Sequence, residues 1–291
     1  LDKQALTEHI EGLTLNQLGF SQDVIASLRR LSSEPYGMFL VTGPTGSGKT
    51  TSLYAAISEV NKGYDKIITI EDPIEYQLPG VLQIPVNEKK GLTFARGLRS
   101  ILRHDPDKIM VGEIRDSETA QIAIQAALTG HLVFSTLHTN SAIESITRLV
   151  NMGVQPYLIT STVELIIAQR LVRKVCEHCK KPAETSPAMI EIVKKALDAL
   201  HVEGEIDAKL LEGMKFHEAS GCEKCNNVGY SGRVCLYEVF RMNNELRKLI
   251  AEGATTIVLQ EAAQKHGMVT LEQSGIIKAL EGSTTLEEVY R

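Results

Sequence analysis

Gly43-Pro44-Thr45-Gly46-Ser47-Gly48-Lys49-Thr50 is the stretch of sequence that decides the fold of this chain. Its spacing, G-x-x-x-x-G-K-[ST], is that of a phosphate-binding loop between a strand and a helix. An apolar run at 38–41 precedes it and a run of helical period at 50–60 follows it, as the motif requires. Glycines let backbone N–H groups turn toward phosphate oxygens, and the helix N-terminus adds a favourable dipole. The sequence therefore predicts a nucleoside triphosphate site.

Individual residues of this loop have expected contacts. Lys49 is predicted to reach the β- and γ-phosphates, and the hydroxyl of Thr50 is predicted to bind Mg²⁺. The residues expected to hold the nucleotide are Gly43, Pro44, Thr45, Gly46, Ser47, Gly48, Lys49, Thr50 and Thr51.

Length and composition set outer limits. The 291 residues suffice for one large core or two modest ones. An apolar fraction of 43% is ordinary for a globular protein, and no apolar run approaches the ~20 residues that span a bilayer. The net charge of −5 argues against a protein that coats nucleic acid. The chain opens at Leu1 in a helical pattern, and we expect it to be part of a longer protein with domains upstream.

Strand-like and helix-like segments alternate around the loop. The predicted strands are 38–41, 66–70, 108–111 and 131–135, and the predicted helices are 50–60, 93–103, 117–129 and 141–152. This alternation predicts an α/β fold of βαβ units with a largely parallel sheet and the nucleotide at the carboxyl ends of the strands.

Other segments suggest how the chain is divided. Helices are expected at 2–11 and 21–31, with Ser21 capping the second, and a hairpin-like insertion is expected at 78–86. The cysteines begin after about residue 172, and a helical pattern resumes at 243. We expect an adjoining segment, an ATPase-type core, a cysteine subdomain and a C-terminal helical subdomain at 1–36, 37–174, 175–235 and 236–291.

Acidic residues follow two predicted core strands. Glu71 follows the strand at 66–70, and Glu113 follows the apolar run at 109–111, in the Walker B position. Triphosphate hydrolysis needs a carboxylate for the metal ion, another for the attacking water and positive charge for the transition state. Acids at strand ends can also merely solvate a sheet edge. Beside a complete phosphate loop, we favour Glu71 and Glu113 as catalytic residues together with Lys49.

Basic side chains are candidates for the positive charge. Arg96, Arg99 and Arg103 share one face of the predicted helix at 93–103, and Arg115 lies close to Glu113. Spacing alone leaves two interpretations open: a solvated stripe, or a cluster that faces phosphate or a neighbouring subunit.

Two histidines flank the strand-like run after Walker B. A single histidine is by default structural, and this holds for His131 and for His138. The position of His138 nevertheless favours a role as a γ-phosphate sensor, and we count it as a candidate catalytic residue.

Four cysteines form two C-x-x-C pairs, Cys176 with Cys179 and Cys222 with Cys225. Such pairs predict tetrahedral Zn²⁺ held by four thiolates, with no position open for substrate. Two disulfides or a redox pair are alternatives, and they fit a nucleotide-binding protein of a reducing compartment poorly. Cys235 is left over and is interpreted as an ordinary buried thiol.

The combined motifs resemble the type II secretion and type IV pilus assembly ATPase family. The resemblance rests on TGPTGSGKTT at 42–51, TIEDPIEY at 69–76, DPD at 105–107 leading to GEIRD at 112–116, TGHL at 129–132 with STLHT at 135–139, and AQRL at 168–171. In the family the first four of these are called Walker A, Asp box, Walker B and His box.

The resemblance implies a RecA-like ATPase that works as a homo-hexamer with ATP between subunits. By position, Glu71 matches the residue that positions or activates water, and Glu113 matches the Walker B carboxylate; which of the two is the base stays open. Family arginines near the nucleotide and subunit contacts match Arg99, Arg103, Arg115 and, near the metal subdomain, Arg233. In the family the metal is zinc.

The resemblance also implies a type of motor, its partners and its location in the cell. The tetracysteine pairs favour an assembly or secretion motor over a retraction motor, because retraction motors lack this insertion. The expected partners are inner-membrane platform and adaptor proteins, with a cytoplasmic location peripheral to the membrane. The alternative is a nucleic-acid-stimulated motor, a helicase or DNA-uptake protein, suggested by five basic residues against one acid at 170–181. The scarcity of aromatic residues, 5%, argues against direct nucleic-acid binding.

Overall fold

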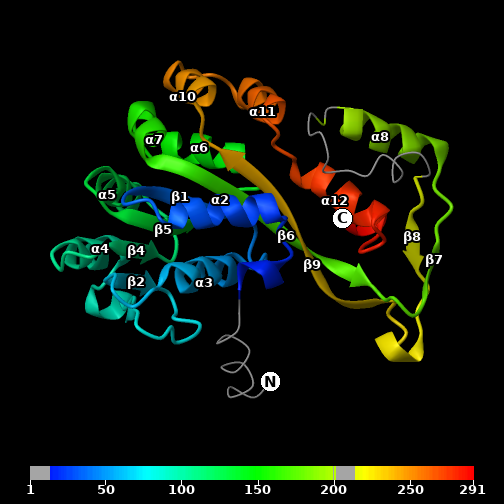
Figure 1. The fold of residues 1–291 in the computed structure, drawn as a ribbon, viewed down its shortest axis with the longest axis horizontal. Coiled ribbons are helices and arrows are strands. Elements are labelled where there is room, and N and C mark those ends of the chain that lie inside the picture. The colour runs from blue at the N-terminus through cyan, green and yellow to red at the C-terminus, as the bar shows by residue number, and fades with distance from the viewer. Residues whose placement is uncertain (1–13, 199, 201–213) are drawn as a thin grey trace.

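The computed structural model describes residues 14–198, 200 and 214–291, and one seven-stranded sheet runs through most of this part of the chain (Figure 1). The strand order is β3-β2-β4-β5-β1-β6-β9. The strands are β1 (Gly37–Thr42), β2 (Ile67–Glu71), β3 (Leu82–Pro85), β4 (Lys108–Val111), β5 (Leu132–Leu137), β6 (Val163–Val175) and β9 (Tyr230–Arg241). Neighbouring strands are parallel except β6 and β9. This confirms the predicted α/β fold.

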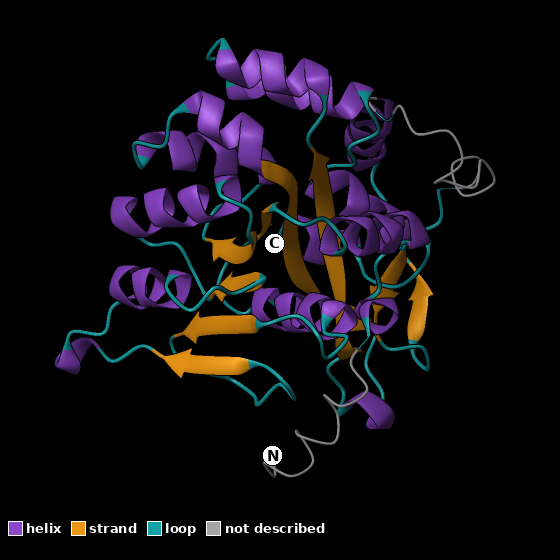
Figure 2. Cartoon of the chain, turned by 60° about the vertical axis from the view of Figure 1, so that its left-hand side comes forward, coloured by secondary structure: helices purple, strands orange, loops and turns teal. Residues whose placement is uncertain are grey.

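Helices lie on both faces of this sheet (Figure 2). On one face are α2 (Gln22–Ser32) and α3 (Lys49–Val60), with the short η1 (Leu15–Leu18). On the other face are α4 (Phe94–Leu102), α5 (Ser117–Leu128), α6 (Ala142–Asn151), α7 (Pro156–Thr162), α10 (Asn244–Ala251) and α11 (Thr256–Lys265). All six residues of β1 are buried, as expected for a central parallel strand covered on both sides.

A smaller group of elements packs beside the sheet. It contains β7 (Lys180–Pro182), α8 (Pro187–Asp198), β8 (His217–Ala219), η3 (Glu223–Cys225), α12 (Leu271–Leu280) and α13 (Leu286–Tyr290). Val193 of α8, Phe216 and Ile276 of α12 belong to a separate hydrophobic cluster there. In the residues that the structure describes, no helix is both long and apolar enough to cross a bilayer.

Most predicted elements are confirmed to within one or two residues. Ser21 caps α2 as expected, because its hydroxyl accepts a hydrogen bond from the N–H of Val24. The expected helix at 2–11 lies outside the described residues.

The hairpin-like insertion expected at 78–86 is wrong. Residues 82–85 form β3, which pairs in parallel with β2, so the connection is not a hairpin. Pro85 ends this strand at the sheet edge, where a missing N–H removes no ladder bond. A short η2 (Glu88–Lys90) then leads to α4.

Strand β6 was not among the predicted strands. It is 13 residues long and pairs with β1 on one side and with β9 on the other. Its basic second half hides the strand pattern. Strand β6 runs through 174–175 and β9 through 235–236, where we expected domain boundaries, so the fourfold division of the chain stays a prediction.

Candidate functional site

The phosphate loop lies between β1 and α3, at the carboxyl ends of the parallel strands. Gly43 packs against β6 so closely that a Cβ there would lie 2.2 Å from the carbonyl oxygen of Gln169. Only glycine fits this approach. Gly48 caps α3 in a left-handed conformation, and Lys49 is the first residue of the helix. The loop therefore faces the N-terminus of α3, where backbone N–H groups favour an anion.

The ammonium of Lys49 lies inside this loop. Its Nζ donates to the carbonyl of Gly43 at 2.9 Å and to that of Pro44 at 3.0 Å. Burial lowers the pKa of Lys49, and the nearby negative charge of Glu113 partly offsets this effect. The Walker B glutamate thus lies within electrostatic range of the loop lysine, as the sequence predicted.

Glu113 is held between two basic side chains. Its Oε1 accepts a hydrogen bond from Arg115 at 2.6 Å, and its Oε2 lies 3.2 Å from Nε2 of His138. Burial alone raises the pKa of Glu113, but Arg115, helped by His138, more than offsets it and lowers the pKa overall. Glu113 is therefore ionised at neutral pH. Arg115 also reaches Asp72 of the Asp box, at 3.5 Å.

Hydroxyl groups align the strand ends that carry these residues. The hydroxyl of Thr42, directly before the loop, bonds to the carbonyl of Leu137 at 3.0 Å and contacts the hydroxyl of Thr139 at 2.6 Å. These two residues flank His138. The phosphate loop and the His box are therefore tied together at the ends of adjacent strands β1 and β5.

Glu71 occupies a different environment. It ends β2, its side chain is buried, and its carboxylate accepts hydrogen bonds from three neutral groups: the hydroxyls of Tyr54 and Thr69 and the amide of Gln83. Thr69 is 2.5 Å away and Gln83 is 3.1 Å away. Glu71 thus lies below the surface near α3, whereas Glu113 is partly exposed.

Two contributors were missed or given no role by the sequence analysis. Gln169, within the AQRL motif, donates from its side-chain amide to the carbonyl of Ser47 at 2.8 Å and accepts from the hydroxyl of Ser52 at 2.9 Å. Tyr54 contacts Glu71 from helix α3. The helical period of 50–60 signalled only that Tyr54 is buried, so sequence alone offered no sign of this contact.

The other candidate side chains lie as follows. Arg99 forms an exposed ion pair with Glu118 of α5 at 2.6 Å, and Arg103 is exposed at the end of α4. Arg233 is exposed on β9, opposite Arg173 of β6. In the described part of the chain, no hydrogen bond or ion pair joins these three arginines to the phosphate loop. His131 contacts the carbonyl of Ala126 at 3.0 Å, a structural role.

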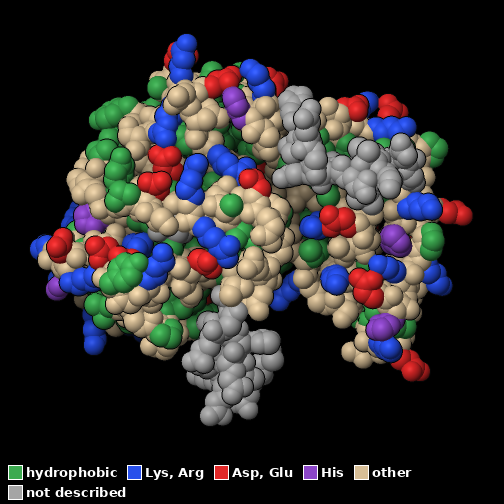
Figure 3. All heavy atoms as spheres, in the orientation of Figure 1, with side chains coloured by type: hydrophobic (Ala, Val, Ile, Leu, Met, Phe, Trp, Pro, Cys, Tyr) green, Lys and Arg blue, Asp and Glu red, His purple; other side chains and the backbone are tan. Residues whose placement is uncertain are grey.

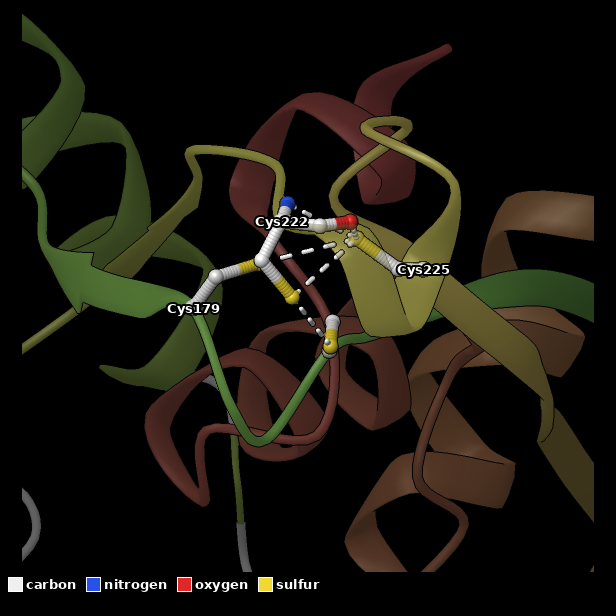
Figure 4. A group of neighbouring side chains, drawn as sticks. Cys179, Cys222 and Cys225 are labelled. Carbon is white, nitrogen blue, oxygen red and sulfur yellow. Dashed lines mark hydrogen bonds between the residues drawn. The ribbon is translucent and has the colours of Figure 1, made fainter.

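The four paired cysteines converge on one point, and Figure 4 shows Cys179, Cys222 and Cys225 of this group. Their sulfurs all lie within 4.8 Å of one another. The Sγ atoms of Cys176 and Cys222 are 3.9 Å apart, and those of Cys179 and Cys225 are 3.8 Å apart. Sulfurs bound at ~2.3 Å around a tetrahedral Zn²⁺ would be about 3.8 Å apart, so the cluster fits this metal. All four cysteines are free of disulfides.

Backbone groups around the cluster favour a thiolate. The N–H groups of Cys222 and Gly229 both donate to Sγ of Cys225, each at 3.2 Å. Burial raises the pKa of Cys225, but these and other hydrogen bonds outweigh burial and lower the pKa to about 6. Gly229 has φ +80°, and a Cβ there would lie 2.7 Å from the Cβ of Ala219. Glycine is therefore required at this position beside the sulfurs.

The fold and the site define a class: a phosphate-loop α/β protein with a RecA-like parallel core, a Walker B glutamate and a tetracysteine cluster. A family model described as "Type II/IV secretion system protein" matches residues 4–291. The chain belongs to this family.

Curated relatives carry two kinds of name. The chain is 46% identical over 275 residues to a type IV pilus assembly ATPase, PilB, of Thermus thermophilus, covering 94% of this chain and 30% of that protein. It is 45% identical over 294 residues to the type II secretion system ATPase E of Vibrio cholerae, covering 100% of this chain and 54% of that protein. The chain thus spans between about a third and about half of these relatives' length.

Solved structures support the fold. The pilus retraction motor PilT with bound ADP has a TM-score of 0.67 and 32% identity, and the match covers 95% of this chain and 65% of that one. The Legionella pneumophila ATPase DotB also has a TM-score of 0.67, with 24% identity, over 95% of this chain and 64% of that one.

Proposed function

We propose that this chain is the motor part of an ATPase that hydrolyses ATP to power assembly of a type IV pilus or a type II secretion pseudopilus. The observation that carries the proposal is the meeting of two motifs at the carboxyl ends of parallel strands. The phosphate loop with Lys49 lies within electrostatic range of Glu113, which Arg115 and His138 hold in its ionised form.

Each residue has a proposed role. The loop from Gly43 to Thr51 binds the triphosphate, with Lys49 leaving the carbonyls of its own loop for the phosphates. Thr50 and Glu113 would hold Mg²⁺ or its water shell, and the metal would supply positive charge that neutralises the phosphates.

The remaining polar groups act on water and on charge. Glu71 positions or activates the attacking water. His138, which contacts Glu113, senses the γ-phosphate. Loss of the γ-phosphate on hydrolysis would change the negative charge near the imidazole of His138. Arg115 supplies positive charge that stabilises the transition state.

We propose a homo-hexamer with ATP between subunits. Arg99, Arg103 and Arg233 are exposed and lack contacts with the loop within the part of the chain that is described, which suits arginines that act on a neighbouring subunit. In such a ring, nucleotide turnover would change subunit orientation and so do mechanical work.

The names of the relatives support the proposed role in pilus assembly or type II secretion. Relatives at 45–46% identity are named for pilus assembly and type II secretion, whereas the retraction motor PilT is 32% identical. We therefore propose that the whole protein is cytoplasmic and peripheral to the inner membrane, and that platform and adaptor proteins of the machine are its partners.

We propose that the tetracysteine cluster holds one structural Zn²⁺ per chain through Cys176, Cys179, Cys222 and Cys225. The sulfur spacing and the N–H donors to Cys225 support this proposal. All four positions of a tetrahedral ion would be filled, so the metal would stabilise the fold of the segment rather than catalyse.

Ion pairing in the described part of the chain disfavours direct nucleic-acid binding by the basic segment at 170–181. Three basic residues of 170–181 are paired with acids: Arg173 with Glu288, and Lys174 and Lys180 with Glu177. On the face in Figure 3, basic and acidic side chains are interspersed and leave no broad basic patch.

The test is ATP turnover by the full-length protein. Wild type should hydrolyse MgATP, and Lys49→Ala should abolish turnover while its thermal unfolding stays unchanged. Full activity of Lys49→Ala would reject the proposed site. Strong, salt-sensitive stimulation by single-stranded DNA would favour the nucleic-acid motor instead.

A further inference from the structure

One phenol on the phosphate-loop helix holds two residues of the Asp box. Tyr54 is only 1% exposed, and its hydroxyl donates to Oε2 of Glu71. The hydroxyl oxygen of Tyr54 also accepts a hydrogen bond from the backbone N–H of Glu75 at 3.3 Å. A single side chain of α3 therefore fixes the turn from residue 71 to residue 75.

The position of Tyr54 on α3 links this turn to the nucleotide site. Tyr54 is four residues after Thr50, so the two side chains lie on the same face of the helix, about 6 Å apart along its axis. The helix that presents Lys49 and Thr50 also presents the group that holds Glu71. The distance between the phosphate contacts and Glu71 is thus set by one rigid helical turn.

The environment keeps the phenol a hydrogen-bond donor. Burial, together with the hydrogen bond to Glu71 and its charge, raises the pKa of Tyr54 well above its ordinary value. The ring of Tyr76 packs edge-on against that of Tyr54, with centroids 5.8 Å apart, and restricts the ring orientation. The hydroxyl of Tyr76 makes no hydrogen bond within the described residues.

The carboxylate of Glu71 depends on such donors. It is only 2% exposed, and its three partners Tyr54, Thr69 and Gln83 are all neutral. Tyr54 is the partner of Oε2, whereas Thr69 and Gln83 both contact Oε1. Without the phenol, one carboxylate oxygen loses its partner and can rotate.

We propose that Tyr54 is a positioning residue for hydrolysis, which acts by holding the Glu71 carboxylate at a set distance from the phosphate contacts of α3. The inference rests on the proposed function, in which Glu71 directs the attacking water. Tyr54 itself touches neither ATP nor water in this scheme. Its hydroxyl governs the chemical step and leaves nucleotide binding unchanged.

The experiment is steady-state hydrolysis of MgATP by the full-length Tyr54→Phe variant. A hydrogen bond to a charged group contributes about 1.5–3 kcal/mol, so we expect kcat to fall by about 10- to 100-fold. The KM for MgATP and the affinity for a fluorescent ADP analogue should stay within about threefold of wild type. Tyr76→Phe, which removes a neighbouring hydroxyl, is the matched control and should keep wild-type kcat.

A double-mutant cycle tests whether Tyr54 acts through Glu71. In a Glu71→Gln background, Tyr54→Phe should lower kcat by less than about twofold, because the positioned group is already lost. A Tyr54→Phe variant with wild-type or increased kcat would overturn the inference, and so would an undiminished effect in the Glu71→Gln background. A drop in nucleotide affinity that matches the drop in kcat would show a merely structural role and overturn it too.

These outcomes are distinct from failure of the proposed function. If wild type shows no hydrolysis that depends on Lys49, the proposed function fails and the inference fails with it. If hydrolysis depends on Lys49 and Glu71 while Tyr54→Phe equals wild type, only the inference fails.

Discussion

The side-chain amide of Gln169 on β6 donates to the carbonyl of Ser47 in the phosphate loop, over 2.8 Å. The same side chain accepts a hydrogen bond from Ser52 in the first turns of α3, at 2.9 Å. Strand β6 therefore holds both the loop and the helix that follows it. Because β6 also pairs with β9, this contact connects the nucleotide site to the strand that leads away from the cysteine cluster.

Replacement of Gln169 should weaken nucleotide binding. Gln169→Met keeps the approximate shape but leaves the carbonyl of Ser47 and the hydroxyl of Ser52 without their buried partner, at a cost of about 1–3 kcal/mol. We expect affinity for a fluorescent ADP analogue to fall by about tenfold, measured by titration. Gln125→Met, the same change at an exposed position of α5, should bind as wild type does. Equal affinity of both variants would contradict the proposed support of the loop.

Loss of Arg115 should shift the pH dependence of hydrolysis. Arg115 lowers the pKa of Glu113 against the effect of burial, so Arg115→Ala raises that pKa. The carboxylate then protonates at higher pH, and the acid limb of the kcat/KM profile should move to higher pH. A pH–rate series measures this shift. Arg148→Ala, an exposed change on α6, serves as control, and an unmoved acid limb in Arg115→Ala would argue against Glu113 as the group that must be ionised.

The cysteine cluster should bind one zinc ion per chain. Cys176→Ser should lose the metal and increase amide hydrogen exchange in the described residues between 174 and 235, while nucleotide affinity stays unchanged. Metal content by mass spectrometry and hydrogen exchange measure the two effects.

Cys235→Ser is the matched control for zinc. Burial raises the pKa of Cys235 to about 12, and its sulfur is not part of the cluster. The Cys235→Ser variant should retain a full equivalent of zinc. Wild type without zinc, or Cys176→Ser with a full equivalent, would reject the metal site.

Because of the contact between Glu288 and β6, the stability of the fold should decrease as the pH becomes acidic. The Arg173 guanidinium, 2.6 Å away, lowers the pKa of the buried Glu288 to about 2 against the opposing effect of burial. A lowered carboxyl pKa contributes stability that is complete above the unfolded-state value of about 4.5 and is lost as the pH falls toward 2.

Thermal unfolding of wild type and Glu288→Gln between pH 7 and pH 2.5 measures this contribution. Glu288→Gln should unfold at a lower temperature at pH 7, and the difference should shrink steadily below about pH 4.5. A difference that stays constant over this range would show that the ion pair with Arg173 is not its cause.

Local motifs allowed much of the fold to be predicted. The strands around the phosphate loop were predictable because each is a short, largely apolar run, and β1, β2 and β4 end at or next to a glycine or an acid. Strand β3 was mistaken for part of a hairpin because two prolines suggest a tight turn, whereas β3 runs parallel to β2, the strand directly before it in the chain. Strand β6 was missed because Arg170, Arg173 and Lys174 make its second half basic, so that no continuous apolar run marks it in the sequence.

The sequence by itself predicted that the loop from Gly43 to Thr50 binds phosphate and that the two C-x-x-C pairs form one metal-type cluster, because both predictions depend on residue spacing within short segments. Only the tertiary structure decided that Tyr54 meets Glu71 and that Gln169 supports Ser47. Those contacts join separate elements, and pairing across the sheet, rather than any local pattern, brings their side chains together.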